Sequence, residues 1–191
     1  NYDPVGKKFI YAGEDGASVT IPVSGIGYAS KLTFSIDGAT CSTEEGATTV
    51  GIDHTFVGDL VGTLTSPAGK SVTLFSRSGG TGNNICQAVF DDSATRSFSS
   101  VLAGDAPFTG SWTPASGTLS SLLADSADGN WTFKVQDVVG SDKGSIRSVT
   151  LHVAGWIVRP RRPAHEDRVA EQRARPQHAQ LVEPRDGRLA V

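Results

Sequence analysis

The chain has 191 residues, 38% of them apolar and 19% charged, with 22 glycines and a net charge of −3. A body of this size can bury about 70% of its unfolded surface, so its core needs neither a metal nor many disulfides. Low charge with abundant glycine, serine and threonine is typical of a turn-rich β-protein rather than a helical one. No run of 18 apolar residues occurs, so we expect no transmembrane helix and no membrane partner.

The first part of the chain predicts two strands and a loop. Ala17–Val23 alternates apolar and polar residues, and Pro22 within it predicts a sheet edge or a strand end. Lys31–Ile36 has the clearest alternation, with every second side chain on one face. Asp37–Thr49 is rich in glycine, threonine and acids, and we expect it to be a loop.

A central hairpin is predicted within His54–Phe75, where two alternating stretches flank the turn sequence Ser-Pro-Ala-Gly. Pro67 presets φ at the second turn position, and Gly69 can take a positive φ at little cost. Gly62, inside the first strand, predicts a bulge. A hairpin is marginal alone, so a second sheet must cover its apolar face.

The second half predicts more short strands, separated by glycine-rich turns. They lie at Ile85–Phe90, Phe108–Trp112, Trp131–Gln136 and Ile146–Val153, with one helical turn or a packed loop at Leu119–Leu123. Many short strands without a sustained helical period indicate an all-β sandwich, here of about eight or nine strands. Spacing alone leaves a jelly roll and an immunoglobulin-like sandwich both open.

The composition changes sharply after Gly155. Residues 156–191 contain eight arginines, no lysine and a net charge of +3, whereas residues 1–155 carry −6. We therefore predict a domain over 1–155 and a disordered Arg/Pro-rich tail over 156–191. The tail lacks interleaved aromatics, and its acidic residues weaken the positive electrostatic potential of its arginines. No nucleic-acid partner is therefore expected. Out-of-frame translation of GC-rich DNA would also produce such a shift, and the residues leave that alternative open.

Cys41 and Cys86 are the two cysteines of the chain. In a secreted protein they would pair, and closing a loop of that span would stabilise the fold by about 4 kcal/mol in the chain-entropy model. Two free thiols too far apart to bond are the alternative. Two cysteines are too few for a structural zinc site. Methionine is absent and no signal peptide is visible, so we expect the C-terminal part of a longer protein.

None of the four histidines completes a recognisable hydrolase site. His165 and His178 lie in the predicted tail, and His152 points outward from the core face of its predicted strand. Only His54 has acids nearby on both sides. No serine occupies a G-x-S-x-G elbow, and the HEDRV sequence at His165 lacks the second histidine of H-E-x-x-H. We therefore predict no catalytic centre in this chain.

Seven segments form an ordered set: His54–Leu60, Leu64–Gly69, Val72–Arg77, Phe90–Asp92, Pro107–Gly110, Leu119–Ser120 and Asp128–Asp137. Together they resemble the P domain (P/Homo B domain) of subtilisin-like proprotein convertases and related secreted bacterial proteases. The resemblance extends over roughly Ala17 to Val153 and implies a jelly-roll β-sandwich.

The resemblance implies structural roles for the motif residues, which are His54, Phe56, Gly58, Asp59, Pro67, Gly69, Trp131 and Asp137. His54 and Asp59 are expected to hydrogen-bond and brace a bend between strands, with Phe56 packed below.

In the family, such a domain packs through an apolar patch on a Ser-His-Asp protease domain and supports its folding and stability. The expected function is therefore that of a non-catalytic accessory domain of a secreted, extracellular bacterial serine endopeptidase, with the protease domain of the same precursor as partner. A metalloprotease precursor is the less favoured variant. The alternative is a free-standing extracellular module that binds carbohydrate or protein, for which an exposed row of aromatics on one sheet would be diagnostic.

Calcium is the candidate cofactor. Ca²⁺ takes six to eight oxygen ligands at ~2.3–2.6 Å, usually from loops. Asp59, Asp91, Asp92 and Asp128 lie at the ends of matched motifs and could converge at one end of the sandwich. The alternative is that these carboxylates cap turns by accepting backbone N–H bonds.

Overall fold

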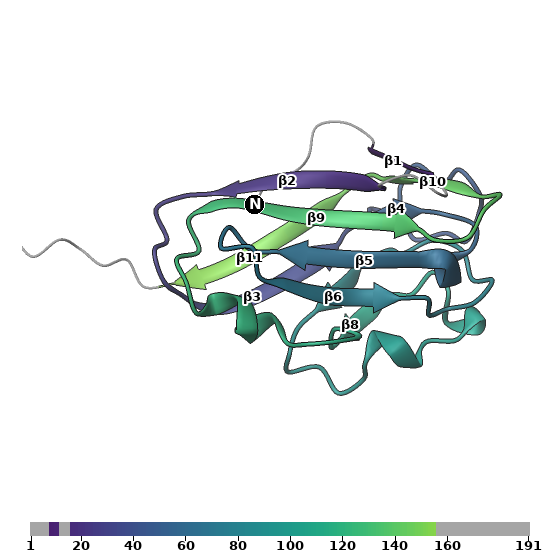
Figure 1. Ribbon diagram of the computed structural model, residues 1–191. Helices are drawn as coiled ribbons and strands as arrows, with labels where there is room; N and C mark the ends of the chain where they lie inside the picture. Colours follow the sequence, from purple (N-terminus) through teal and green to yellow (C-terminus); the bar gives the residue numbers. More distant parts are fainter. Residues whose placement is uncertain (1–7, 12–15, 156–191) are drawn as a thin grey trace, which may run out of the picture. The chain divides into compact units, whose positions relative to one another are not determined.

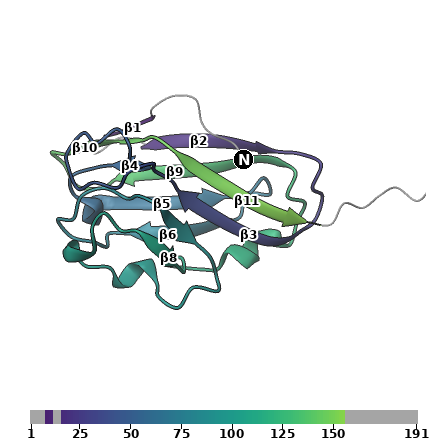
Figure 2. The same cartoon turned by 180° about the vertical axis from the view of Figure 1, so that it is seen from behind.

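The structure is a computed structural model in which residues 8–11 and 16–155 are described. Two four-stranded sheets face each other (Figure 1). The first has the order β2 (Ala17–Val23), β9 (Gly129–Asp137), β5 (Leu60–Thr65) and β6 (Ser71–Ser76). The second has the order β11 (Val149–Gly155), β3 (Ala29–Ile36), β7 (Ala88–Phe90) and β8 (Gly110–Trp112), and it lies in front when the molecule is seen from behind (Figure 2).

A small third sheet joins β1 (Lys8–Tyr11), β10 (Lys143–Ile146) and β4 (Ile52–Asp53). The helical segments of the described residues are four short 3₁₀ turns: η1 (Val57–Asp59), η2 (Phe98–Ser100), η3 (Ala103–Asp105) and η4 (Leu119–Leu123). None of these is long and apolar enough to cross a membrane. The all-β sandwich is confirmed, and its strand orders are consistent with a jelly roll.

The core lies between the two large sheets because their strands alternate buried and exposed residues. In β2 and β5 the pattern is strict, as expected for strands that bury one face. Phe34 of β3 and Phe133 of β9 meet across the interior with ring centroids 4.7 Å apart. Phe75 of β6 and Phe90 of β7 make a second contact between the sheets, at 6.3 Å. Burying each such side chain contributes about 1.5–3 kcal/mol relative to leaving it in water.

The predicted central hairpin is confirmed as β5 and β6, which pair antiparallel. Its turn is closed by a hydrogen bond from Gly69 N to Ser66 O of 2.9 Å, and Gly69 has φ +81°, which favours glycine. The register shifts between Gly62 and Thr63, so the predicted bulge is also present. Pro22 lies in β2, an edge strand, as expected.

One predicted strand is wrong. Ile146–Val153 is broken into β10 and β11, which belong to different sheets. The chain crosses between the sheets at Arg147 and Ser148, whose backbone N–H groups both donate to Gly51 O, at 2.8 and 3.3 Å. Alternation alone cannot reveal such a crossing. This break and the small third sheet explain why the described residues form eleven strands where eight or nine were predicted. The predicted tail over 156–191 lies outside the described residues, so the domain boundary stays a prediction.

Candidate functional site

The residues of the His54 motif surround a buried histidine–carboxylate pair. His54 follows β4, Asp137 ends β9, and His54 Nε2 lies 3.2 Å from Asp137 Oδ2, with both side chains fully buried. His54 Nδ1 lies 3.2 Å from the backbone N of Phe56 and 3.1 Å from its carbonyl oxygen, and Nε2 is the donor to Asp137 because a carboxylate oxygen accepts. The N–H of Val139 donates to the other carboxylate oxygen at 3.1 Å. The pair therefore joins the end of β9 to the segment that leads into β5.

Two expectations for this motif need correction. The predicted partner of His54 was Asp59, but the structure places Asp137 there. Asp59 lies in η1, where its backbone carbonyl accepts a bond from Val138 N at 3.0 Å. The predicted burial of Phe56 is also wrong, because 39% of this residue is exposed. The physical reason is that the η1 turn buries Val57 and leaves Phe56 at the surface, while the pairing of Leu60 with Asp137 brings β9 beside the histidine.

Three other motif residues have clear structural roles. Gly58 approaches Gly80 so closely that a Cβ would lie 2.6 Å from Gly80 O, and its N–H donates to that oxygen at 2.9 Å. Trp131 is fully buried and donates from Nε1 to Ala127 O at 2.8 Å. Pro67 lies in the β5–β6 turn. These positions depend on shape and packing rather than on chemical reactivity.

Asn84 belongs to the same buried cluster, and the sequence analysis missed it. It is fully buried with φ +68°, and its side-chain oxygen accepts a bond from His54 N at 3.0 Å. Its Nδ2 donates to Ser42 O at 2.8 Å and to Glu44 O at 2.9 Å. Asparagine tolerates a positive φ better than most residues, but the polar run around Asn84 gave no sign of burial. The residue fastens the loop before β4 to the histidine.

Cys41 and Cys86 form a disulfide with a Cα–Cα distance of 5.5 Å. The bond and the Asn84 contacts hold the same part of the Asp37–Thr49 loop. This loop is therefore fastened to the body at several points.

A buried ion pair lies beside this loop. Arg147 Nη2 lies 2.7 Å from Asp53 Oδ2, and the two side chains are 10% and 11% exposed. The N–H of Gly46 donates to the other oxygen of Asp53 at 2.9 Å. Arg147 Nε and Nη1 are buried without a hydrogen-bond partner among the described residues. The pair holds the loop, β4 and the β10–β11 crossing together.

Three of the four candidate calcium ligands, Asp91, Asp92 and Asp128, have carboxylates with separate partners. The carboxylate of Asp92 accepts backbone bonds from Leu119 and Ser120, at 2.7 and 2.8 Å. Asp128 accepts bonds from Ile26 and Gly27, at 2.9 and 3.2 Å. These two residues cap turns, which is the alternative raised for them above.

The carboxylate of Asp91 contacts a lysine on one side and a turn on the other. Its Oδ2 lies 2.8 Å from Lys31 Nζ, while its Oδ1 accepts bonds from the backbone and hydroxyl of Ser93. The Lys31 contact first, and then the Ser93 bonds, lower the pKa of Asp91 from 3.8 to about 2. Among the described residues no group of three or more His, Cys, Asp or Glu side chains could hold a metal ion. The arrangement of Asp59, Asp91, Asp92 and Asp128 therefore does not fit an ion that needs six to eight oxygens.

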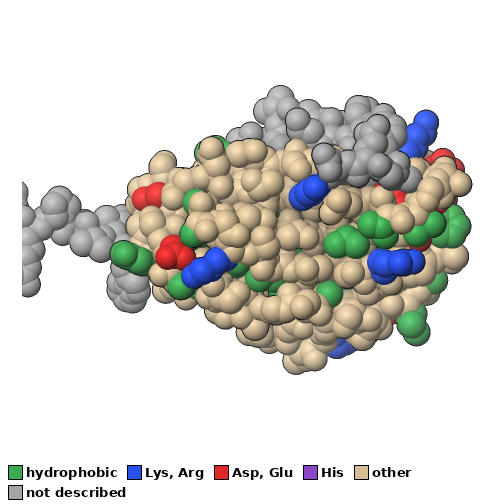
Figure 3. Space-filling model, viewed as in Figure 1, with side chains coloured by type: hydrophobic (Ala, Val, Ile, Leu, Met, Phe, Trp, Pro, Cys, Tyr) green, Lys and Arg blue, Asp and Glu red, His purple; other side chains and the backbone are tan. Residues whose placement is uncertain are grey.

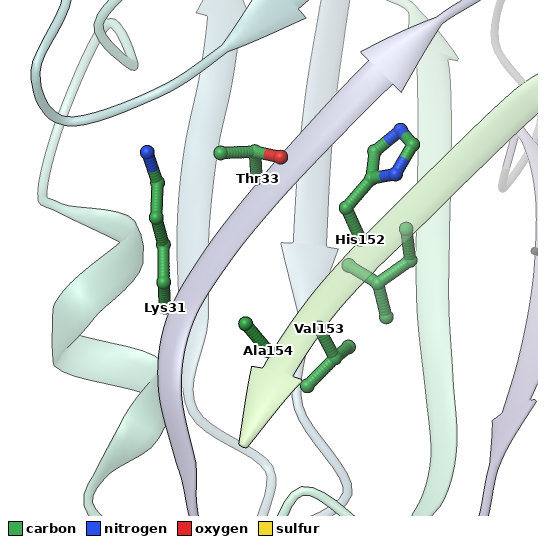
Figure 4. A pocket seen from close by; sticks show the side chains of 6 residues that line it. Lys31, Thr33, His152, Val153 and Ala154 are labelled. Carbon is green, nitrogen blue, oxygen red and sulfur yellow. The ribbon is translucent and has the colours of Figure 1, made fainter.

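A hollow of about 260 Å³ lies on the outer surface of the second sheet, where Lys31 and Thr33 of β3 face His152, Val153 and Ala154 of β11 (Figure 4). His152 is exposed, as predicted, and its Nε2 lies 3.4 Å from Ser35 Oγ. Ser35 Oγ donates to Asp37 Oδ1 at 2.6 Å. Serine, histidine and aspartate thus meet, but the serine lies between the other two. In a nucleophilic triad the histidine must lie in the middle to take the serine proton, so this order does not activate Ser35.

Comparison with known proteins agrees with the motif analysis. The family model of the proprotein convertase P-domain matches residues 43–153. A calcium-dependent protease of Trichormus variabilis is 32% identical over 108 residues, which are 55% of this chain and 13% of that protein. The chain therefore spans a small part of the curated relative.

Two solved structures of Aeromonas sobria serine protease, one of them in complex with the chaperone ORF2, also match. Both are 18% identical, with TM-scores of 0.46 and 0.45. The matches cover 78% and 76% of this chain, and 25% and 24% of the solved chains. Because the P-domain model matches more than half of the sequence, this chain belongs to the proprotein convertase P-domain family.

Proposed function

We propose that this chain is a non-catalytic accessory domain that stabilises the protease domain of the same precursor or assists its folding. The observation that carries the proposal is the burial of His54 and Asp137, which are fully enclosed and hydrogen-bonded to their surroundings. A histidine–carboxylate pair in this position braces loops and cannot reach a substrate. Family membership supports a place beside a protease.

The curated relative supports association with proteolysis. That protein is named a calcium-dependent protease, and 87% of its length lies outside the segment that matches this chain. We propose a serine-type endopeptidase as the catalytic partner, following the resemblance of the motifs to subtilisin-like convertases. A disulfide between Cys41 and Cys86 supports an extracellular location, because such bonds persist in oxidising compartments.

The mechanism we propose is preferential binding to the native protease domain. A partner that binds the folded form but not the unfolded form stabilises it by mass action. Connection in one chain raises the effective concentration, to the millimolar range for short flexible linkers. The accessory domain thus needs only modest affinity to stabilise its partner.

The described surface supports this role over carbohydrate binding. The outer face of the β2-β9-β5-β6 sheet carries Thr63, Thr65, Thr132 and Lys134 at positions paired across the strands, instead of a row of aromatics. The exposed aromatic side chains noted among the described residues are Tyr28 and Phe56, which belong to separate loops.

We propose a calcium requirement only for the whole precursor protein. The name of the relative supports a calcium requirement, but the four candidate aspartates of this domain do not fit a site. We therefore propose that a calcium ion needed by the precursor binds outside these four residues.

The first experiment reads the coding sequence upstream of Asn1 and through the tail. An in-frame subtilisin-type domain with its own serine, histidine and aspartate is the expected result. A start codon close to Asn1 without a protease would overturn the accessory role and favour the free-standing binding module. The same reading decides whether the arginine-rich tail is genuine.

The second experiment compares the precursor with a form that lacks this chain. Removal should lower the temperature at which protease activity is lost, or abolish the yield of active enzyme, because the stabilising partner is gone. An enzyme of unchanged yield and heat resistance would contradict the proposal.

A further inference from the structure

β11 is an edge strand with an open side. It pairs with β3 on one side, and within residues 8–11 and 16–155 no backbone hydrogen bond is recorded on its other side. Just before the strand, Ser148 O accepts a bond from Asp37 N at 3.0 Å, and bonded pairs alternate along an antiparallel ladder. His152 therefore directs its backbone N–H and C=O toward β3, whereas Leu151 and Val153 direct theirs toward the open side.

The other outer edges of the two large sheets are obstructed. Along β6, Ala115 N donates to Leu74 O at 2.9 Å. Directly after β8, Thr113 O accepts a bond from Phe98 N at 3.1 Å. β2 contains Pro22, which has no N–H to donate. β11 contains no proline and keeps a regular register with β3 until its last residue, so in the described part of the chain it is the edge best suited to the addition of another strand.

Two hollows accompany the open side of β11. The outer hollow is the one of about 260 Å³ on the outer surface of the second sheet (Figure 4). A second one, of about 280 Å³, lies between β11 and the end of β2, and we call it the inner hollow. Leu151 and Val153 line both hollows, so the open edge runs between them.

The inner hollow fits apolar side chains. Successive side chains of a strand point to opposite faces, so a peptide paired with β11 places every second side chain in this hollow. There it meets Pro22, Val23 and Ile26. The outer face of the first sheet differs, because Figure 3 shows mostly uncharged polar side chains and backbone there, and no residue of β9, β5 or β6 lines any of the four described hollows.

The outer hollow fits an acidic side chain. Lys31 and His152 are its basic residues, and the side chain of Lys31 is 59% exposed although it contacts Asp91. Ala154 pairs with Lys31 and is the small residue that stands between the lysine and the open edge. Neighbouring strands lie about 4.8 Å apart, so an added strand lies about 10 Å from β3, a gap that a glutamate and a lysine span together.

We propose that the open edge of β11 binds an extended segment of a separate protein, in which apolar residues alternate with acidic ones. Its backbone pairs with Leu151 and Val153, its apolar side chains enter the inner hollow, and a carboxylate faces Lys31. A second copy of β11 would bring a histidine instead of a carboxylate to the outer hollow. The sequence that follows β11 has Arg159, Arg161 and Arg162, so it does not supply the carboxylate either. This binding site is additional to the proposed function and does not depend on it.

The first test measures amide hydrogen exchange in the 191-residue chain. Without peptide, the amides of Leu151 and Val153 should exchange at least about tenfold faster than those of Thr150 and His152, their controls in the same strand. Protection of Leu151 and Val153 in the free monomer would show that the chain itself covers the edge. Protection that appears only in a concentration-dependent dimer would show that a second copy does. Either result overturns the inference.

The second test identifies the peptide. Random peptides of about eight residues, displayed on phage, are selected on the immobilised 191-residue chain, and the enriched sequences are synthesised. We expect apolar residues at alternate positions with aspartate or glutamate between them, and these peptides should slow exchange at Leu151 and Val153. No enrichment, enrichment of basic sequences, or enrichment without alternation would overturn the inference.

Two variants locate the site by fluorescence anisotropy of a labelled enriched peptide. Val153→Pro removes an N–H that β3 does not use, so the chain should still fold, which thermal unfolding checks, while binding should weaken at least about tenfold. Lys31→Glu should weaken binding at least about threefold. Lys70→Glu is its control, because Lys70 is a similarly exposed lysine paired with an aspartate elsewhere on the surface. Equal affinity of the Lys31 and Lys70 variants, or undiminished binding to a folded Val153→Pro, would place the peptide elsewhere and overturn the inference.

Discussion

Two histidines of this domain lie in opposite surroundings. His54 is 1% exposed and contacts Asp137, Phe56 and Asn84 through both ring nitrogens and its backbone. His152 is exposed, and the contact of its ring is with Ser35 Oγ, at 3.4 Å. The carboxylate of Asp137 contacts the His54 ring directly, and the carboxylate of Asp37 is linked to the His152 ring through Ser35. Only His54 holds distant segments together.

The difference lies in what surrounds each hydrogen bond. Water can replace a partner at the surface, so a lost contact near His152 costs little. Water cannot reach the His54 cluster, where removing one partner leaves another group buried and unsatisfied. Residues of the same type therefore differ in importance by several kcal/mol. Residue identity alone does not reveal which of the two is structural.

The largest expected effect comes from replacing the two histidines. His54→Ala should lower the free energy of unfolding by about 3–5 kcal/mol, because it leaves the Asp137 carboxylate buried without its histidine partner. His152→Ala, the control, should change it by less than about 0.5 kcal/mol. Urea unfolding of both variants measures the difference. Equal losses would show that the buried pair has no special role.

Replacing Asn84 should lower the free energy of unfolding by an intermediate amount, and its neighbour Asn83 serves as the control. Asn84→Ala should cost about 2–3 kcal/mol, because His54 N loses a buried partner while Ser42 O and Glu44 O lose part-buried ones. Asn83 donates one exposed bond, to Thr43 O, so Asn83→Ala should cost at most about 0.5 kcal/mol. Chemical unfolding of the two variants, together with proteolysis of the Asp37–Thr49 loop, checks this. A loop that stays as protected in Asn84→Ala as in the parent would argue against the fastening role.

The smallest effect is expected at the surface pair of Lys31 and Asp91. The folded pKa of Asp91 is about 2, below the ordinary 3.8, so its ionised form stabilises the fold at neutral pH. That contribution is present above about pH 4 and is lost as the pH falls through about 2.

Because the Lys31 side chain is 59% exposed, solvent screens the pair, and Asp91→Asn should cost less than about 1 kcal/mol at neutral pH. Unfolding measurements along a pH series should show the parent and variant converging toward acid. A gap that widened toward acid would contradict this assignment. High salt should also narrow the gap.

The sequence by itself determined most of the strands and the central turn of this domain. Alternation in Ala17–Val23 and Lys31–Ile36 predicted two strands, because a half-buried strand must alternate its side chains. The turn at Pro67 and Gly69 was predictable for a local reason, since φ preferences act within a few residues. The ordered motifs from His54 to Asp137 also sufficed to indicate the family.

Only the tertiary structure decided the contacts between segments. Asp137 lies 83 residues from His54, and Asn84 lies 30 residues away. Asp59 was the wrong partner because nearness in sequence says nothing about where the next turn carries a side chain. The crossing at Arg147, the exposure of Phe56 and the separate partners of the three aspartates Asp91, Asp92 and Asp128 have the same cause. Alternation encodes which face of a strand is buried, but the ends of strands meet through packing of the two sheets, which no local pattern records.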